Sequence, residues 1–226
     1  LTPPTNDRMQ LRYAIRRAEF GNGTSLYDAV ESTIERELRR IQGRKAVVLF
    51  TDGVDTTSRR GSYTNSLRAS EESDALFYPI RYDTSREMGV GRGYPGRGGG
   101  YPPVRRGGRV SMADILGAIL MGGNVNIGGG GSGSSASEYE TGRQYLETLA
   151  QNSGGRQFEA QSLYNLDAAF SGIAEELRRQ YSLGYYPDNV GRPGDRKQIR
   201  IRVMRPNVVV RAKNSYIVGQ NNTAGR

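Results

Sequence analysis

The sequence lacks three residue types on which much enzyme and metal chemistry depends. Its 226 residues contain no Cys, no His and no Trp. Without thiolate and imidazole groups there can be no Cys–His zinc site, no Cys nucleophile, no disulfide and no Ser-His-Asp triad. Any acid, base or metal ligand must be a carboxylate, a hydroxyl, an amide, a Tyr or a Lys. Because no motif places a nucleophile beside a base, we expect a protein that is not an enzyme.

Long hydrophobic runs are also missing. The longest runs, such as Ala46–Phe50, have the length of a strand, whereas a membrane helix needs about 20 apolar residues. We therefore expect no membrane span. Lysine is scarce, since only Lys45, Lys197 and Lys213 occur among the 32 basic residues, and the net charge is +9. This charge allows contact with nucleic acid, anionic lipid or an acidic protein and does not choose between them.

Helical and strand patterns alternate along the chain, which is typical of an α/β fold with a parallel sheet and helices on both faces. They predict helices over 25–41, 62–73, 137–152 and 166–180, and strands over 45–50, 75–82 and 156–159. Asn165 is the expected N-cap of the last helix. The continuous apolar run over 45–50 predicts a strand buried on both faces, whereas Pro79 indicates that the next strand lies near an edge.

Two Gly-rich tracts interrupt this pattern, with nine Gly within 89–109 and seven within 122–133. Their composition is typical of flexible loops or linkers, and a short helical pattern over 111–120 lies between them. The C-terminal part changes character. Short strands predicted over 181–186, 198–203 and 208–212 indicate a small antiparallel unit.

Asp52 is the best candidate for a functional residue. It ends the most apolar strand, and in an open α/β sheet the ligand site lies beyond the carboxyl ends of the strands. Thr24 and Ser25 would present hydroxyls at the same edge, and such oxygen ligands suit Mg²⁺, Mn²⁺ or Ca²⁺ better than zinc. The alternative is that Thr24 or Ser25 merely caps a helix and Asp52 merely begins a turn with Gly53. Spacing alone leaves both interpretations open.

Segments spread along most of the chain resemble the von Willebrand factor A (VWFA) domain, in particular the bacterial VWFA-related group. They are Gly23–Val30, Arg44–Ser58, Leu149–Phe158 and Glu176–Tyr185, followed by Arg205-Pro206 and Val210–Ala212. The resemblance implies a Rossmann-like sheet with a metal-ion-dependent adhesion site. In the family, Mg²⁺ or a similar ion is held there by an Asp-x-Ser-x-Ser loop, one Thr and one Asp. By position, the Thr is Thr24 and the Asp is Asp52.

Two other carboxylates lie near these positions in the sequence. Asp28 falls in the first turn of the predicted helix, where a negative charge favours the helix dipole. Asp55 is a loop carboxylate with no assigned role.

The sequence departs from the family in its missing loop. No Asp-x-Ser-x-Ser occurs, the nearest segment, Asp83–Glu87, follows the wrong strand, and Leu1–Asp7 resembles the part of the family that follows the third strand. We therefore expect either part of a longer protein or a sheet completed by another chain, and a bound ion only if that loop is supplied. The expected organisation is a partial VWFA-like domain over 1–180 with Gly-rich insertions at 84–110 and 122–136, a β extension over 181–218 and a disordered tail over 219–226.

The resemblance implies a non-enzymatic, adhesion-type module that binds an acidic residue of another protein, in an extracytoplasmic location. Arg and Tyr interleaved with Gly over 92–109 support a different hypothesis, a protein that binds nucleic acid or an anionic surface. We prefer to interpret that tract as a solvated loop insertion. Further alternatives are a structural subunit completed by self-assembly or by a partner chain, and a metal-dependent hydrolase acting through Asp52, which the absence of a second carboxylate cluster disfavours.

Overall fold

The computed structural model describes residues 2–18, 23–82, 136–160 and 163–219. It divides into two compact units, one formed by 1–23 with 84–132 and the other by 24–83 with 133–226. In the first unit the described helix is α1, Arg8–Arg16, which the sequence patterns do not predict. Its N-cap is Asp7, whose carboxylate accepts hydrogen bonds from the N–H groups of Met9 (2.8 Å) and Gln10 (3.3 Å). The elements that follow belong to the second unit.

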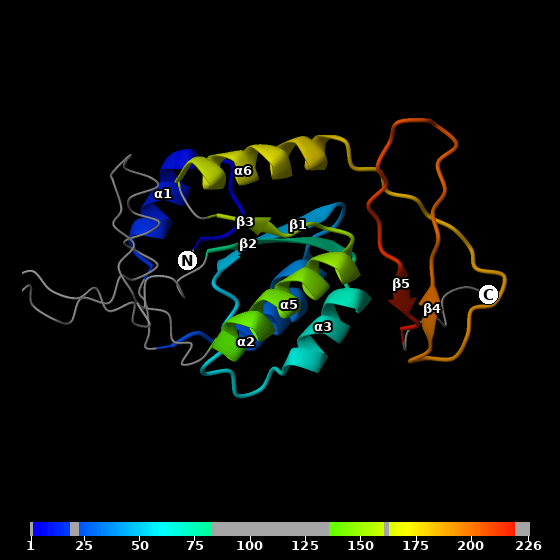
Figure 1. Ribbon diagram of the computed structural model, residues 1–226, viewed down its shortest axis with the longest axis horizontal. Coiled ribbons are helices and arrows are strands. Elements are labelled where there is room, and N and C mark those ends of the chain that lie inside the picture. The colour runs from blue at the N-terminus through cyan, green and yellow to red at the C-terminus, as the bar shows by residue number, and fades with distance from the viewer. Residues whose placement is uncertain (1, 19–22, 83–135, 161–162, 220–226) are drawn as a thin grey trace, which may run out of the picture. The chain divides into compact units, whose positions relative to one another are not determined.

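A parallel sheet organises the second unit (Figure 1). Its strands are β1, Lys45–Thr51, β2, Ala75–Arg81, and β3, Phe158–Glu159, in the order β1-β2-β3. β1 and β2 pair along their whole length, whereas β3 pairs only with the last two residues of β2. Parallel strands connected through helices confirm the predicted α/β class. This architecture is shared by many α/β folds and does not single out the VWFA fold.

Three helical segments cover one face of the sheet (Figure 1). They are the continuous run α2 (Leu26–Ser32), η1 (Thr33–Glu37, a π-helix) and η2 (Leu38–Arg40, a 3₁₀-helix), then α3 (Tyr63–Glu72) and α5 (Ala136–Ser153). The sequence predicts one apolar stripe on the first of them, and most of that stripe is buried against residues of the sheet and of α5 (Leu26, Val30, Ile34 and Leu38 with Phe77, Tyr145, Leu146 and Leu149). Its last member, Ile41, is 38% exposed. The helices predicted over 25–41, 62–73 and 137–152 are therefore confirmed.

The helix α6, Leu163–Arg178, lies on the opposite face of the sheet (Figure 1). The spacing of Ala169, Ile173 and Leu177 by four predicts this amphipathic helix, and Ala169 and Ile173 are buried whereas Leu177 is half-buried. The predicted cap is wrong, because the helix begins at Leu163 and Asn165 lies within its first turn. No Gly or Pro precedes Asn165 in this segment, so nothing stops the helix from extending upstream.

β1 is less buried than its apolar run predicts. In the part of the chain that the structure describes, it pairs with β2 alone, and Val48 is 42% exposed. The prediction of a strand buried on both faces is wrong, because α6 packs over β2 and β3 and leaves the outer face of β1 open.

The prediction that β2 lies near an edge, made from Pro79, is also wrong. β2 is the central strand of the three. The N–H of Phe77 points away from β1 and donates to Ser153 Oγ (2.9 Å), whereas that of Tyr82 donates to Thr51 on the β1 side (3.2 Å). N–H directions alternate along a strand, so position 79 faces the same way as Phe77. β3 begins to pair only at Ile80. Pro79 therefore occupies a place where no ladder donor is needed.

The C-terminal part forms an antiparallel pair with different strands from those predicted. β4, Arg196–Gln198, pairs with β5, Ser215–Ile217. The strands predicted over 181–186, 198–203 and 208–212 are wrong, apart from Gln198, which lies in β4. Alternation of apolar and polar residues favours a strand only where one face can be buried, and residues 200–212 are all exposed.

Some predicted features lie outside the described residues. These are the Gly-rich tracts up to residue 135, the helix predicted over 111–120, the Asp83–Glu87 segment and the tail beyond Gly219. Among the helices that are described, none has the length and apolarity needed to cross a membrane.

Candidate functional site

Asp52 lies where the sequence analysis places it, directly after β1 at the carboxyl edge of the sheet. It is 5% exposed, and its Oδ1 accepts the N–H of Val54 at 3.1 Å. Gly53 between them has a φ of 90°, a conformation that glycine adopts at little cost, and its N–H donates to Thr51 Oγ1 at 3.1 Å. The turn weighed above as the structural role of Asp52 is therefore present, and it engages Oδ1.

Thr24 is bonded to the loop that follows Asp52. Its N–H donates to Thr56 Oγ1 (2.8 Å), and its carbonyl accepts the N–H groups of Thr56 (2.8 Å) and Thr57 (3.1 Å). The neighbouring Ser25 hydroxyl is 2.7 Å from that of Thr57 and makes no helix-capping bond. The start of α2 and the loop after β1 are thus joined at one edge, although the chain separates them by about 30 residues.

A close backbone approach sets the position of the Asp52 loop. A Cβ added to Gly142 on α5 would lie 2.5 Å from the carbonyl oxygen of Gly53, and one added to Gly53 would lie 2.8 Å from the carbonyl carbon of Gly142. Neither position admits a side chain unless the backbone moves. Sequence reasoning missed Gly142, because a single Gly in a helical pattern says nothing about what approaches it.

The carboxylates of Asp55 and Asp28 hold the same loop together. Asp55 accepts bonds from the N–H of Tyr27 (3.1 Å) and from the hydroxyl of Ser58 (2.5 Å). Asp28 accepts three successive backbone N–H groups, those of residues 59, 60 and 61, at 3.0, 3.0 and 2.5 Å. Hydrogen bonds from the N–H groups of Arg59 and Gly61 lower the pKa of Asp28. Asp55, to which the sequence assigns no role, therefore has a structural one. Asp28 lies in the first turn of α2, as predicted, and also binds the backbone of the loop after β1.

The donor set of this edge is too small for the cation that the VWFA resemblance implies. Thr24 and Asp52 offer the oxygen chemistry that Mg²⁺, Mn²⁺ or Ca²⁺ requires, but Mg²⁺ takes about six oxygen ligands. Across the described residues, no group of three or more His, Cys, Asp or Glu could hold a metal ion. Asp28 and Asp55 already accept loop hydrogen bonds. The described residues alone do not complete such a site, and the metal ligation by Thr24 and Asp52 stays a prediction.

Tyr82 is a further residue of this edge that sequence reasoning missed. Its ring packs on Phe50 with centroids 4.7 Å apart, and its N–H donates to the carbonyl of Thr51 (3.2 Å). Burial, and secondly the charge of Asp52, raise the pKa of Tyr82 well above its usual value. Its phenol therefore stays neutral across the physiological pH range.

A small pocket of about 180 Å³ adjoins the Asp52 loop. Its walls come from Tyr27 on α2, from Gly53–Asp55, and from Ser137 and Thr141 on α5. Its volume is below that of a typical site for a drug-sized ligand, about 300 Å³ or more. The pocket could admit a single side chain or a few waters.

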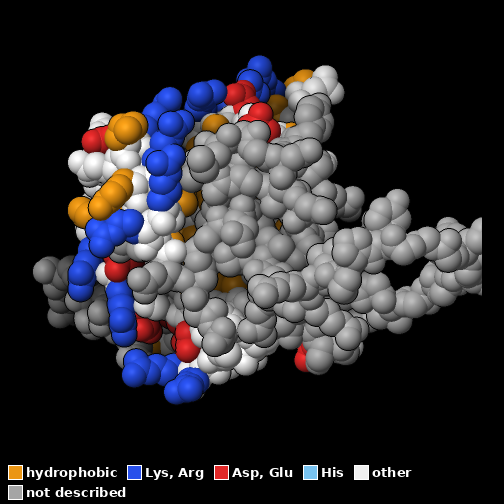
Figure 2. Space-filling model, turned by 90° about the vertical axis from the view of Figure 1, so that its left-hand side faces the viewer, with side chains coloured by type: hydrophobic (Ala, Val, Ile, Leu, Met, Phe, Trp, Pro, Cys, Tyr) orange, Lys and Arg blue, Asp and Glu red, His pale blue; other side chains and the backbone are white. Residues whose placement is uncertain are grey.

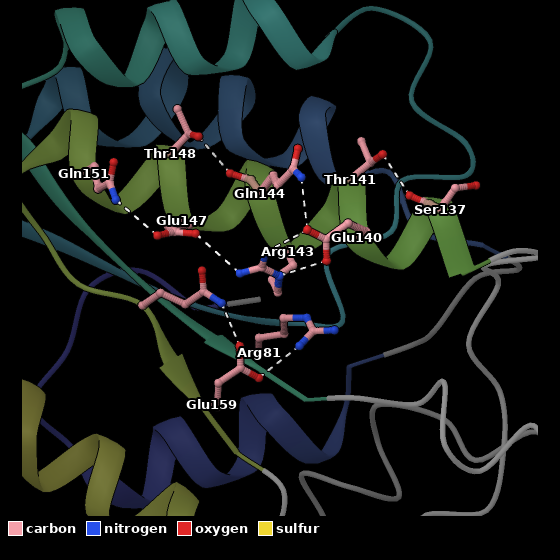
Figure 3. Close-up of polar contacts among 11 residues, drawn as sticks. Arg81, Ser137, Glu140, Thr141, Arg143, Gln144, Glu147, Thr148, Gln151 and Glu159 are labelled. Carbon is pink, nitrogen blue, oxygen red and sulfur yellow. Dashed lines mark hydrogen bonds and ion pairs between the residues drawn. The ribbon is translucent and has the colours of Figure 1, made fainter.

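Charged side chains form two groups of contacts, one along α5 and one between β2 and β3 (Figure 3). Glu140 accepts bonds from Arg143 (2.6 and 2.9 Å) and from Gln144 (3.0 Å), and these bonds, with that of Arg143 first, lower the pKa of Glu140 to about 2. Arg81, at the end of β2, is 8% exposed and bonds Glu159 of β3 at 3.0 Å. Each of these charged groups thus has an oppositely charged neighbour.

Positive charge is visible over the surface as well. The face drawn in Figure 2 shows more Lys and Arg side chains than Asp and Glu side chains, in line with the net charge of +9. The Arg-Gly-Tyr tract on which the nucleic-acid hypothesis depends lies outside the described residues. That hypothesis therefore stays a prediction from composition.

Comparison with known proteins neither supports nor contradicts the VWFA resemblance, which depends on the sequence motifs alone. No family model matches the chain, and neither the curated proteins nor the solved structures yield a match.

Proposed function

We propose that this chain is a non-enzymatic protein-binding module of the VWFA type, whose binding edge is formed by the Asp52 loop and the start of α2. The observation that carries the proposal is the bonding of Thr24 to Thr56 and Thr57 in the loop after Asp52. The VWFA-like segments Gly23–Val30 and Arg44–Ser58 thus lie side by side at the sheet edge where α/β proteins bind ligands.

The resemblance adds a chemical expectation to this edge. A divalent cation, preferably Mg²⁺, would be bound there through the Asp52 carboxylate and the Thr24 hydroxyl once further oxygen ligands are supplied, and an acidic side chain of the partner protein would be one of those ligands. An extracytoplasmic location follows from the resemblance as part of the same proposal.

The test uses Mn²⁺ as the probe, because a paramagnetic ion reports even weak binding through the broadening of nearby amide signals. In the wild-type chain water would fill the positions of the missing ligands, so binding would be weak, and we expect Mn²⁺ to broaden the amide resonances of residues 24–25 and 52–54 before all others. Asp52→Asn should abolish this broadening. The control Asp188→Asn changes the same charge at an exposed position and should leave it intact.

Two results would contradict the proposal. Broadening that persists in Asp52→Asn would show that Asp52 does not hold the ion. Broadening spread evenly over the exposed carboxylates of the chain would show that the edge has no preference for a cation.

A further inference from the structure

Exposed apolar side chains gather in two segments of the described chain, residues 181–190 and residues 199–214, and we call the second the arm. All residues from 200 to 212 are exposed. Met204 is 97% exposed and Val209 is 85% exposed, and Ile201, Val203, Val208 and Val210 each exceed a third. At the end of the arm, Pro206 and Asn207 form a turn in which Asn207 has a φ of 58°. Figure 1 shows the arm as two legs, orange and red, that join away from β4 and β5.

The base of the arm is firmly held. β4 pairs with β5, and the N–H of Ile199 donates to the carbonyl of Asn214 at 2.7 Å. The buried carboxylate of Glu71 on α3 accepts bonds from Arg196 (2.8 Å) and from the Ser215 hydroxyl. The ammonium group of Lys213 donates to the carbonyl of Glu71 at 2.7 Å. The arm is therefore presented from a fixed base.

Beyond this base the backbone of the arm has no partner in the described structure. Between residues 200 and 212 there is no backbone–backbone hydrogen bond within the described ranges. The sequence here has the period of a strand, with Ile199, Ile201 and Val203 alternating with Arg200 and Arg202. A segment with strand alternation and open N–H and C=O groups is suited to pair with another strand.

The positive charge of the arm favours a partner strand that carries acidic side chains. Arg200, Arg202 and Arg205 form no ion pair with the described residues, whereas Arg211, near the base, pairs with Glu176. Acidic side chains opposite these arginines would satisfy them. A second copy that paired through its own arm would bring the same arginines to this place, and like charges repel. A lipid bilayer would leave the open backbone groups without partners in hydrocarbon.

We propose that the arm is a docking site for an extended, acidic segment of a partner protein, which adds as a β-strand with its carboxylates against Arg200 and Arg202. This surface is distinct from the Asp52 edge. Lys213 is bonded at the carbonyls of Glu71 and Ser73, just before β2 begins, so the base of the arm lies at the amino end of the sheet. The inference does not depend on the function proposed above and requires no metal.

The test measures binding of a short peptide of alternating Glu and Val by fluorescence anisotropy, together with hydrogen exchange of the arm. We expect saturable binding that EDTA does not affect, with slower exchange of amides in 199–212. A peptide of alternating Lys and Val should not bind. The double variant Arg200→Glu/Arg202→Glu should weaken binding of the acidic peptide by roughly tenfold or more and should gain binding of the basic one.

Two further variants separate strand addition from simple charge attraction. Arg39→Glu/Arg40→Glu makes the same charge change at two exposed positions of η2 and should leave binding unchanged. Val203→Pro keeps every charge but removes a backbone donor that has no backbone partner in the described structure, so the protein should fold and bind less tightly.

The proposal is overturned by any of the following results: equal loss of binding in both charge-reversed pairs, undiminished binding by Val203→Pro, or unchanged exchange of the arm amides. Binding to vesicles with phosphatidylserine without binding to the acidic peptide would assign the arm to a membrane surface. Self-association through the arm in place of peptide binding would assign it to a second copy. Loss of peptide binding in EDTA would contradict its independence from the Asp52 edge.

Discussion

The buried carboxylate of Glu71 offers a sharp test of what stabilises this fold, because it bonds both strands at the base of the arm. The side chain of Glu71 is 2% exposed, and it bonds Arg196 Nη2 at 2.8 Å and the hydroxyl of Ser215. In Glu71→Gln the side chain keeps its size but loses its charge, and an NH₂ group replaces an acceptor oxygen. One of the two partners then faces a donor in place of an acceptor.

The cost can be bounded from the exposure of the partners. Removing one member of a fully buried ion pair costs about 3–5 kcal/mol. The Arg196 side chain is 60% exposed and can be rehydrated, so the loss should be nearer to that of a single charge-assisted hydrogen bond, about 2–3 kcal/mol. For a chain of this size such a loss corresponds to a decrease in Tm of roughly 5–10 °C.

Urea denaturation followed by circular dichroism measures this loss, with hydrogen exchange of β4 and β5 as a local readout. The matched control is Glu72→Gln. Glu72 is the next residue, is 42% exposed and pairs with Arg68 at 3.1 Å, so its loss should cost less than about 0.5 kcal/mol. In the Glu71→Gln background, Arg196→Ala should add little. Equal effects of Glu71→Gln and Glu72→Gln would refute the reasoning.

Two further outcomes are expected from the Asp52 edge. Gly142→Ala should destabilise the protein by about 1–3 kcal/mol in urea denaturation, because its Cβ would lie 2.5 Å from the Gly53 carbonyl oxygen, whereas Gly184→Ala enters open space and should have little effect; equal effects would contradict the close approach. Hydrogen bonds from residues 59–61 lower the pKa of Asp28 from 3.8, so the stability they confer is present above pH 3.8 and is lost as the pH falls through the lowered pKa. The urea midpoint of wild type should therefore exceed that of Asp28→Asn near neutral pH and converge with it in acid, and a difference that does not change with pH would contradict this role.

Much of the fold could be predicted from the sequence because its helices follow local periodicity. The spacing of Leu26, Val30, Ile34 and Leu38 marks a buried stripe wherever the rest of the chain lies. Strands are different, because their burial depends on neighbours. Val48 belongs to a continuous apolar run and is nevertheless exposed, and Ile201 alternates perfectly with Arg yet lies in no strand. In both cases the local pattern predicts a strand that a neighbouring strand or helix buries. Whether such a neighbour is present depends on residues far away in the chain.

The same distinction applies to the candidate site. Asp52 and Thr24 could be placed at one edge because the ends of parallel strands and the loops beside them follow from topology. The contact of Gly142 with Gly53 and the bond of Glu71 to Ser215 could not, because each joins positions far apart in the chain, by 144 residues in the second case. Nothing in the residues around Gly142 or Glu71 identifies the group that they meet.

Among the described residues, β1 has a strand on one side only and the arm has no backbone partner, so both present strand groups that are not paired. Soluble proteins commonly protect an edge strand with an outward-facing charge, often a Lys. The lysine of β1 does not serve in this way, since Lys45 is 9% exposed and pairs with Asp74 at 2.8 Å, while Val48 faces outward. In the arm, Arg200 and Arg202 are exposed. They favour a partner strand with acidic side chains and do not prevent such a strand from pairing. These two strand surfaces, one apolar and one basic, are unpaired among the described residues, and the second is the one on which the proposed docking of a partner strand depends.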